Sequence, residues 1–255
     1  MSSFPDFLAR SDGEQLAFRP VDGDGPTVIW VGGFRSDMEG TKALALEAAA
    51  RERGWAYLRY DHFAHGQSSG DWKAATIGRW REDAVAMIDA QEGPVILVGS
   101  SMGGWVALLA ALARPEAVKG LVLIAPAPDF TERLMWPGLA DETRRTILRD
   151  GEALFHDPDG LGDYVLTRRM FDEARDWLLL DRPIRLAQPV RILHGRADEV
   201  VPWRHVAELV ERLVEGSPRV DVAVDYITGG DHRLSTPADL ERLIDAVESM
   251  RARSL

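Results

Sequence analysis

The sequence predicts an α/β fold built on a mostly parallel, doubly wound sheet, and two observations carry this prediction. Short β-like runs alternate with longer segments of helical composition along most of the 255 residues. Central runs such as TVIWVGG (27–33) and PVILVG (94–99) are apolar throughout, as is typical of strands buried on both faces. Strands that alternate with helices need right-handed crossovers, which make the sheet parallel and place helices on both its faces.

The individual elements follow from local patterns. Residues 6–10 and 14–20 predict a β-hairpin around the turn SDG, because polar and apolar residues alternate in the second run. The first half then contains strands at 27–33, 55–61, 94–99 and 118–127, with helices at 38–54, 76–93 and 102–115. Further along, we expect a strand at 190–195, a helix at 204–216, a strand at 219–227 and a helix at 237–253. Ser235-Thr236 before Pro237 is a good start signal for that last helix.

The alternation stops between residues 127 and 188, where helix-like pieces and tryptophans occur without a convincing strand. A loop of this length without secondary structure is rare inside a compact domain. We therefore predict a small helical cap inserted after the sixth strand. The chain would then divide into a first part of the core (1–126), the cap (127–188) and a second part of the core (189–255).

The composition argues against several classes of function. A formal net charge of −11 and a pI near 5.0 repel phosphate backbones, so we do not expect a nucleic-acid partner. The absence of cysteine excludes disulfides, thiolate nucleophiles and cysteine-bound metals. The start MSSFPDFLAR shows no leader pattern, and no run of apolar residues is long enough for a membrane span. These features favour a soluble, cytoplasmic protein.

The stretch GSSMG at 99–103 fits the pattern G-x-S-x-G between a predicted strand and a predicted helix. In this context Ser101 is the predicted nucleophile, because a sharp strand-to-helix turn strains its backbone and raises its Oγ above the sheet. The amino terminus of the following helix supplies free N–H groups and a partial positive charge. Ser100 is displaced by one residue and should point elsewhere. The alternative is a glycine-rich turn that serves packing alone.

A serine nucleophile needs a base and a carboxylate, which should follow it in the order acid, then histidine. His232 lies in the glycine-bearing loop TGGDHRLS between the last strand and the last helix, and is the predicted base. Asp198, in LHGRADEVVP directly after a strand, is the predicted acid, whereas Glu199 should face solvent. The other late histidine, His205, falls in a helical run, where we expect a solvated position. The alternatives are that His232 caps a helix and that Asp198 only forms a turn.

An oxyanion hole requires two backbone donors. The N–H of Met102 is one predicted donor, and the N–H of Phe34, in WVGGFRSDMEG after the first long parallel strand, is the other, with Gly33 as its alternative. Gly32 and Gly33 allow the backbone to approach a substrate closely. His62 and His65, in YDHFAHGQSSGD, are expected in a glycine-stabilised loop that supports the site, and their spacing does not indicate zinc.

Candidate substrate-binding residues are apolar and lie near the predicted cleft. Aromatic side chains there would hold an acyl chain, or would instead form the core of the cap. The candidates are Gly33, Phe34, Met135, Trp136, Trp177 and Trp203, and Tyr164 belongs to the same apolar set of the cap. The pair Arg168-Arg169 would receive an anionic leaving group or solvate a helix face, and we favour the second interpretation.

The strings GGF, VGSSMGGW, LHGRADEVVP and GGDHR, in this order over nearly the whole chain, resemble the α/β-hydrolase superfamily. The longer strings GFRSDMEGTKA, HGRADEVVPW and DHR are most similar to the branch of mitochondrial acyl-protein (palmitoyl) thioesterases and acyl-glucuronide esterases, with their bacterial relatives. This resemblance implies thioesterase or carboxylesterase activity, with Ser101, Asp198 and His232 at the triad positions. The chain departs from a mitochondrial member because no transit segment is recognised at its start.

These observations together predict a serine hydrolase that cleaves carboxylic esters or thioesters through an acyl-enzyme, without cofactor or metal. Its partners would be a small-molecule ester or thioester, or an acylated protein. One alternative is a cofactor-free perhydrolase or haloperoxidase-type enzyme that uses the same triad. A second alternative is a non-catalytic binding protein, although such proteins usually lack one triad member. Dehalogenase chemistry is disfavoured because the turn carries Ser101 and not an aspartate.

Overall fold

The computed structural model describes residues 4–156 and 162–254, within which eight strands form one sheet in the order β1-β2-β4-β3-β5-β6-β9-β10. Their bounds are β1 (Asp6–Ala9), β2 (Gln15–Val21), β3 (Asp24–Val31), β4 (Trp55–Tyr60), β5 (Val95–Ser100), β6 (Val118–Ile124), β9 (Val190–Gly195) and β10 (Val222–Ile227). Strands β1 and β2 pair as an antiparallel hairpin, β2 pairs antiparallel with β4, and β3 to β6, β9 and β10 are parallel. The predicted hairpin and the mostly parallel sheet are both confirmed.

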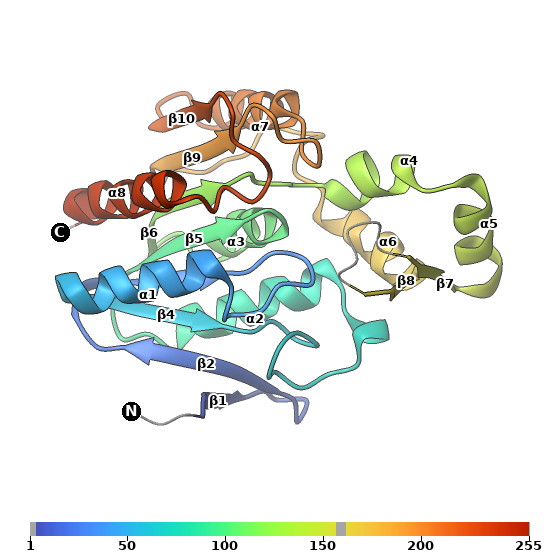
Figure 1. Cartoon of the computed structure of the whole chain (residues 1–255), viewed down its shortest axis with the longest axis horizontal. Coiled ribbons are helices and arrows are strands. Elements are labelled where there is room, and N and C mark those ends of the chain that lie inside the picture. The colour runs from blue at the N-terminus through green and yellow to red at the C-terminus, as the bar shows by residue number, and fades with distance from the viewer. Residues whose placement is uncertain (1–3, 157–161, 255) are drawn as a thin grey trace.

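Helices cover both faces of the sheet (Figure 1). One face packs against α1 (Thr41–Arg53) and α8 (Pro237–Ser254), and the other against α2 (Ile77–Asp89), α3 (Met102–Ala113) and α7 (Trp203–Gly216). Strand residues alternate between the two resulting cores: in β3, Val28 and Trp30 join the cluster under α1 and α8, whereas Ile29 and Val31 join the other. Because both faces are buried, the central strands β3, β5 and β6 consist largely of apolar residues, which is why the sequence predicts them well.

The helix ends follow the sequence signals. Helix α1 ends at Gly54, whose φ of 73° is the left-handed conformation that glycine adopts without steric cost. At the start of α8, the Asp239 carboxylate accepts a hydrogen bond from the Thr236 N–H, and the Thr236 hydroxyl accepts one from the Asp239 N–H. These reciprocal bonds satisfy backbone groups that the first turn of a helix leaves free.

The segment between β6 and β9 lies beyond the carboxyl ends of the parallel strands, on the right of Figure 1. It contains a π-helical turn (Thr131–Met135), α4 (Trp136–Gly138), α5 (Asp141–Asp150), α6 (Arg168–Ala174) and a 3₁₀ turn (Arg175–Trp177). The expectation that this insert has no strand is wrong: β7 (Glu152–Phe155) pairs antiparallel with β8 (Tyr164–Thr167). Each strand has only four residues, too few for a clear alternation, and residues 157–161 between them lie outside the described residues. The limits of the cap, 127 and 188, remain a prediction.

Two buried contacts involve the ends of the cap segment: one joins the two ends to each other, and the other joins the first end to α7. Asp129 is fully buried, and its carboxylate accepts hydrogen bonds from the N–H groups of Leu179 and Leu180, each at 2.8 Å. His205 is buried, and its Nε2 lies 2.7 Å from the Pro128 carbonyl oxygen. The expectation of a solvated His205 is therefore wrong. The reason is helical spacing: His205 stands one turn before Leu209 and therefore belongs to the buried face of α7.

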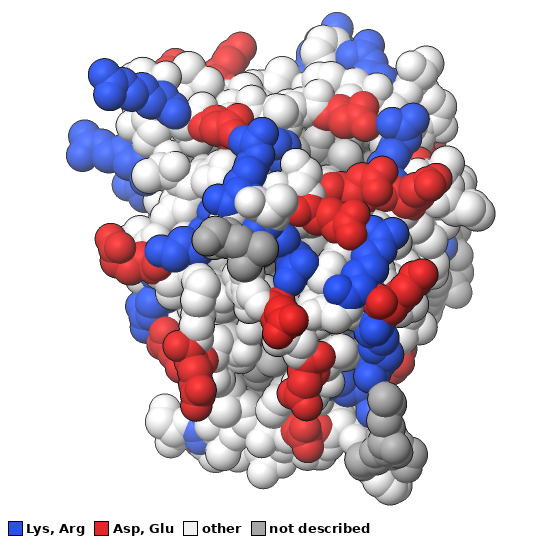
Figure 2. All heavy atoms as spheres, turned by 90° about the vertical axis from the view of Figure 1, so that its left-hand side faces the viewer, with Lys and Arg blue, Asp and Glu red and all other residues white. Residues whose placement is uncertain are grey.

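The face opposite the cap segment carries acidic and basic side chains in close alternation (Figure 2). Arg191 and Arg253 both pair with Asp221, and Arg53 pairs with Glu248. Exposed pairs of this kind stabilise a protein little. Among the described residues, no helix combines the length and the apolar character that crossing a membrane requires.

Candidate active site

Three predicted side chains meet above the carboxyl ends of β5 and β9. His232 Nε2 lies 3.1 Å from Ser101 Oγ, and His232 Nδ1 lies 2.8 Å from Asp198 Oδ2. Because an ionised carboxylate only accepts hydrogen bonds, Nδ1 carries the proton and Nε2 is left to accept from the Ser101 hydroxyl. We refer to Ser101, His232 and Asp198 as the candidate triad.

Ser101 stands at the junction of β5 and α3 with φ 54° and ψ −120°, a conformation that is strained for a residue with a side chain. The glycines around it allow this turn. A Cβ on Gly103 would lie within 3.0 Å of the Val31 and Gly32 carbonyl oxygens, and one on Gly99 would lie within 3.0 Å of the Gly103 carbonyl oxygen. The glycines therefore permit strand, turn and helix to pack closely, and the turn presents a half-buried Ser101 at the edge of the sheet.

Asp198 uses its two carboxylate oxygens differently. Oδ1 accepts the N–H groups of Val200 at 2.9 Å and Val201 at 2.8 Å, while Oδ2 faces His232. Burial raises the pKa of Asp198, but the hydrogen bonds from His232 and from these two N–H groups outweigh it, so the net pKa lies below the usual value. The side chain is therefore ionised at neutral pH. The neighbouring Glu199 is exposed, as expected.

The loop that carries His232 is closely packed on the end of β9. A Cβ on Gly195 would lie within 3.0 Å of the backbone oxygens of Gly230 and Asp231. The Asp231 carboxylate accepts the N–H groups of Arg233 at 3.0 Å and Leu234 at 2.9 Å, which fixes the turn after the histidine. His232 remains partly exposed, with 23% of its side-chain surface accessible, whereas the Asp198 side chain is fully buried.

The predicted oxyanion donors border Ser101. A Cβ on Gly33 would lie 3.2 Å from the Ser100 carbonyl oxygen and 3.6 Å from Ser101 Cβ, so the loop after β3 contacts the turn directly. Within the described part of the chain, neither the Phe34 N–H nor the Met102 N–H donates a hydrogen bond. Both groups therefore remain available as donors.

His62 and His65 are buried in the loop after β4. Burial lowers the pKa of His62 to about 3, with a smaller contribution from His65, so the ring is neutral. His65 contacts the loop after β3 through the Arg35 N–H, at 3.1 Å. In residues 4–156 and 162–254, no three His, Cys, Asp or Glu side chains are grouped as a metal site requires.

Phe34 belongs to a cluster of aromatic rings that joins the core to the cap segment. Its ring centroid lies 5.3 Å from Trp72, 5.7 Å from Phe130 and 5.6 Å from Tyr164 of β8. Trp72 also donates from Nε1 to the Val165 carbonyl oxygen at 2.8 Å. Trp72 and Phe130 were not among the predicted site residues, although each lies in the segment after a predicted strand, where α/β proteins collect site residues.

The other candidate substrate-binding residues have partners outside the candidate triad. Trp136 packs on Phe171 at 4.8 Å, as the alternative of a cap core predicts. Trp177 donates to Glu173 at 2.7 Å, and Met135 packs at the edge of the main core. Trp203 is stacked against the Arg196 guanidinium at 4.2 Å. A role in substrate binding stays a prediction for all four residues. Arg168 and Arg169 are exposed on α6, and Arg168 pairs with Asp172.

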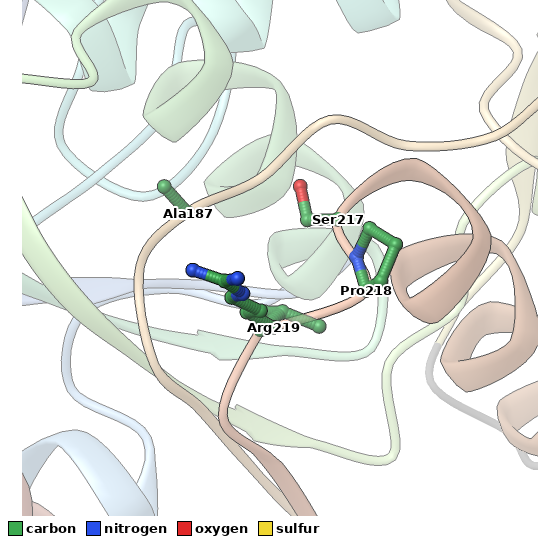
Figure 3. A pocket seen from close by; sticks show the side chains of 5 residues that line it. Ala187, Ser217, Pro218 and Arg219 are labelled. Carbon is green, nitrogen blue, oxygen red and sulfur yellow. The ribbon is translucent and has the colours of Figure 1, made fainter.

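Two surface hollows are lined by other residues. One, of about 360 Å³, is lined by Ala187 and by residues 217–220 before β10, at the amino ends of the strands (Figure 3). The other, of about 430 Å³, is lined by Leu112, Leu179 and residues 182–185. Neither hollow includes a predicted site residue.

A mostly parallel sheet with helices on both faces and a serine at the strand-to-helix turn is the architecture of an α/β-hydrolase. The chain belongs to the serine aminopeptidase S33 family, whose profile matches residues 26–153, and it is a hydrolase. It is 39% identical over 246 residues to the mitochondrial palmitoyl-protein thioesterase ABHD10 of Mus musculus, covering 96% of this chain and 81% of that protein. The corresponding human protein is 36% identical over 248 residues, covering 96% of this chain and 79% of the relative.

Solved structures show the same similarity. Alpha/beta hydrolase domain-containing protein 10 from mouse superposes with a TM-score of 0.88 at 36% identity, covering 98% of this chain and 99% of the other. A putative hydrolase from Agrobacterium vitis S4 gives a TM-score of 0.88 at 38% identity, with 97% of each chain covered. The predicted superfamily and its thioesterase branch are confirmed. The curated thioesterase relatives are named as mitochondrial, and the cytoplasmic location stays a prediction for this chain.

Proposed function

We propose that this hydrolase cleaves carboxylic esters or thioesters with Ser101 as nucleophile, His232 as general base and acid, and Asp198 as the carboxylate that orients the histidine. One observation carries the proposal: His232 stands between the Asp198 carboxylate at 2.8 Å and the Ser101 hydroxyl at 3.1 Å. Hydrogen-bonded chains of this kind activate a serine hydroxyl that is otherwise a weak nucleophile.

In the first step, Ser101 Oγ attacks the substrate carbonyl carbon while His232 Nε2 takes the hydroxyl proton. The ionised Asp198 stabilises the imidazolium and keeps Nδ1 protonated. The carbonyl oxygen becomes an oxyanion, and the free N–H groups of Met102 and Phe34 donate to it. The bond to the leaving alcohol or thiol then breaks, and the leaving group takes its proton from His232.

In the second step, water attacks the acyl-enzyme. His232 again removes a proton, this time from the water, and the same two donors hold the second oxyanion. The bond to Ser101 Oγ breaks, the carboxylic acid leaves, and the serine regains its proton from His232. None of these steps needs a metal or an organic cofactor.

The substrate that we propose is a long-chain acyl thioester, such as a palmitoylated protein. Two observations support this. The relatives quoted above are named palmitoyl-protein thioesterases. In addition, Phe34 carries the candidate oxyanion donor, and its ring packs against the rings of Trp72, Phe130 and Tyr164. An aromatic surface of this kind suits an apolar acyl chain.

The test is hydrolysis of p-nitrophenyl esters, acyl thioesters and acyl glucuronides of graded chain length by the wild type and by a Ser101→Ala variant. We expect the variant to lose hydrolysis and fluorophosphonate labelling while its circular dichroism spectrum is unchanged. Ser100→Ala is the matched control, because this serine is adjacent and buried but does not face His232, and it should keep full activity. Unchanged hydrolysis by Ser101→Ala would refute the assignment.

Two further assays separate the alternative functions. A perhydrolase would form a peracid from a carboxylic acid and hydrogen peroxide, and this peracid would oxidise added bromide, so that a reporter is brominated faster than any ester of the panel is hydrolysed. A binding protein would bind an acyl ligand without turnover and without labelling of Ser101. Preference for short p-nitrophenyl esters over long acyl thioesters would keep the proposed mechanism and reject the proposed substrate.

A further inference from the structure

The loop after β3, residues 32–38, holds one of the two candidate oxyanion donors, and we call it the oxyanion loop. It contains a strained residue: Arg35 has a φ of 56°, in the left-handed region that residues with side chains rarely adopt. The Ser36 N–H donates to the Gly33 carbonyl oxygen at 3.1 Å, which closes a turn around Phe34 and Arg35. A strained turn of this kind persists only if the surrounding structure fixes it.

His65 contacts the centre of this turn. Its Nε2 accepts a hydrogen bond from the Arg35 N–H at 3.1 Å, and its Nδ1 lies 3.0 Å from the Phe63 carbonyl oxygen. A carbonyl oxygen only accepts, so Nδ1 carries the proton and Nε2 is left as an acceptor. The bond to Phe63 therefore selects the tautomer that the Arg35 N–H needs.

The surroundings of His65 keep its ring in place and neutral. The residue is 5% exposed, and its ring centroid lies 5.5 Å from the ring of Trp72 and 5.4 Å from that of Trp80. Burial lowers the pKa of His65, against the smaller opposing effect of its bond to Phe63. The mechanism proposed above does not use this histidine.

The far end of the oxyanion loop is held by other groups. Asp61 Oδ1 accepts the Met38 N–H at 2.7 Å, and Arg59 donates to the Met38 carbonyl oxygen at 2.9 Å. These contacts fix residue 38 but not the peptide between Phe34 and Arg35. The N–H of that peptide instead donates to His65 Nε2.

We propose that His65 is a positioning residue for the oxyanion hole: by accepting the Arg35 N–H, it fixes the peptide that follows Phe34 and so aims the Phe34 N–H at the oxyanion beside Ser101. This inference rests on the proposed function, because it takes the Phe34 N–H as a donor. His65 acts through the backbone and does not touch the substrate.

Two substitutions separate the hydrogen bonds of His65. In His65→Asn, the amide nitrogen reaches the place of Nδ1 and can donate to Phe63, but nothing replaces Nε2 as acceptor. In His65→Gln, the amide oxygen reaches the place of Nε2 and can still accept the Arg35 N–H. We expect His65→Asn to lower kcat by roughly 10- to 100-fold, less than complete loss of an oxyanion donor, with KM changed less than about twofold. His65→Gln should retain kcat within about threefold.

Three further measurements go with the kinetics. A trifluoromethyl ketone, which forms an oxyanion on Ser101, should lose affinity for His65→Asn by the factor seen in kcat/KM. Fluorophosphonate should label that variant more slowly by a similar factor. Hydrogen exchange at residues 32–38 should rise in His65→Asn and stay low in His65→Gln.

Tyr57→Phe is the control for a lost buried hydrogen bond, because the Tyr57 hydroxyl donates to the Ala43 carbonyl oxygen in α1, outside the oxyanion loop. It should lower Tm without changing kcat.

The outcomes distinguish this inference from the proposed function. Absence of hydrolysis by the wild type would reject the proposed function, while labelling rates and hydrogen exchange would still decide the role of His65. A folded His65→Asn variant with unchanged kcat, ketone affinity and labelling rate would overturn the inference. If His65→Asn does not fold, NMR of the wild type provides the decision. Scalar coupling between the Arg35 amide nitrogen and His65 Nε2 should persist in the fluorophosphonate adduct, and its absence there would also overturn the inference.

Discussion

At the scale of single residues, Asp198 uses its two carboxylate oxygens for two different contacts. Oδ1 accepts the two N–H groups of the turn before α7, and Oδ2 accepts from His232. The sequence offered these as alternatives, a turn former or a triad acid. A carboxylate has two oxygens and room for several donors, so the two interpretations do not exclude each other at this position.

This division makes a prediction for Asp198→Asn. The amide oxygen can replace Oδ1 in the turn, so we expect little loss of stability. The neutral amide cannot stabilise an imidazolium, and kcat should fall by about 10³- to 10⁴-fold. Kinetics on the ester panel and a thermal unfolding curve check both statements. The exposed neighbour provides the control, since Glu199→Gln should leave kcat unchanged. An Asp198→Asn enzyme within tenfold of the wild type would contradict the assigned role.

At the scale of elements, the strength of a sequence signal follows the burial of the element. Strands β3, β5 and β6 are buried on both faces and were predicted within a few residues of their observed bounds. The hairpin of β7 and β8 was missed, because strands of four residues are too short to show a clear alternation. His205 was misplaced since its helix was judged by composition, although its spacing from Leu209 marks the buried face.

The strand-to-helix turn gives a prediction at this scale. Gly103→Ala places a methyl group within 3.0 Å of the Val31 and Gly32 carbonyl oxygens, and a backbone cannot move as a flexible side chain does. We expect a loss of about 3 kcal/mol in the free energy of unfolding and a large loss of activity. Gly138→Ala, in α4 with nothing within 4 Å of the added Cβ, should be neutral or slightly stabilising. Chemical denaturation of both variants decides the matter, and equal stabilities would show that the turn tolerates a side chain.

At the scale of the whole molecule, the two-layered core buries acidic side chains that the sequence does not mark as unusual. Asp83 of α2 is fully buried; its Oδ2 accepts the Phe63 N–H at 2.8 Å, and Oδ1 lies 3.5 Å from Arg79 Nε. Burial raises the pKa of Asp83 to about 7, against the lowering effect of the bond from Phe63 and the charge of Arg79. Through its bond to the Phe63 N–H, the Asp83 carboxylate connects α2 with the loop that carries His62 and His65.

The raised pKa of Asp83 predicts how stability depends on pH. Between pH 4 and pH 7 the folded state keeps a proton that the unfolded state releases, so this group's contribution to stability falls as the pH rises and is constant above pH 7. A shift from 3.8 to about 7 corresponds to roughly 4 kcal/mol. Asp83→Asn removes this pH-dependent contribution to stability, because an amide does not titrate in this range. The free energy of unfolding of the wild type minus that of the variant should therefore fall by up to this amount between pH 4 and pH 8, as urea unfolding would measure. A difference independent of pH would show that Asp83 is ionised in the fold.

The sequence by itself determined the order of strands and helices of the main sheet, the turn at Ser101 and the order in which the candidate acid and base follow it. These features are local: continuous apolar runs, helix start and end signals and a glycine-rich turn each act within a few residues. It also indicated which backbone N–H groups are candidates for an oxyanion hole.

Only the tertiary structure decided which side chains meet. The contact of His65 with Arg35 joins two loops 30 residues apart, and the bond of Asp129 to Leu179 and Leu180 joins the two ends of the cap segment. The same holds for the rings around Phe34, which come from β8, from the loop after β4 and from the segment after β6. Such contacts depend on how the helices and the sheet pack against each other. They join residues that are far apart in the sequence, and no periodic pattern along the chain marks these residues.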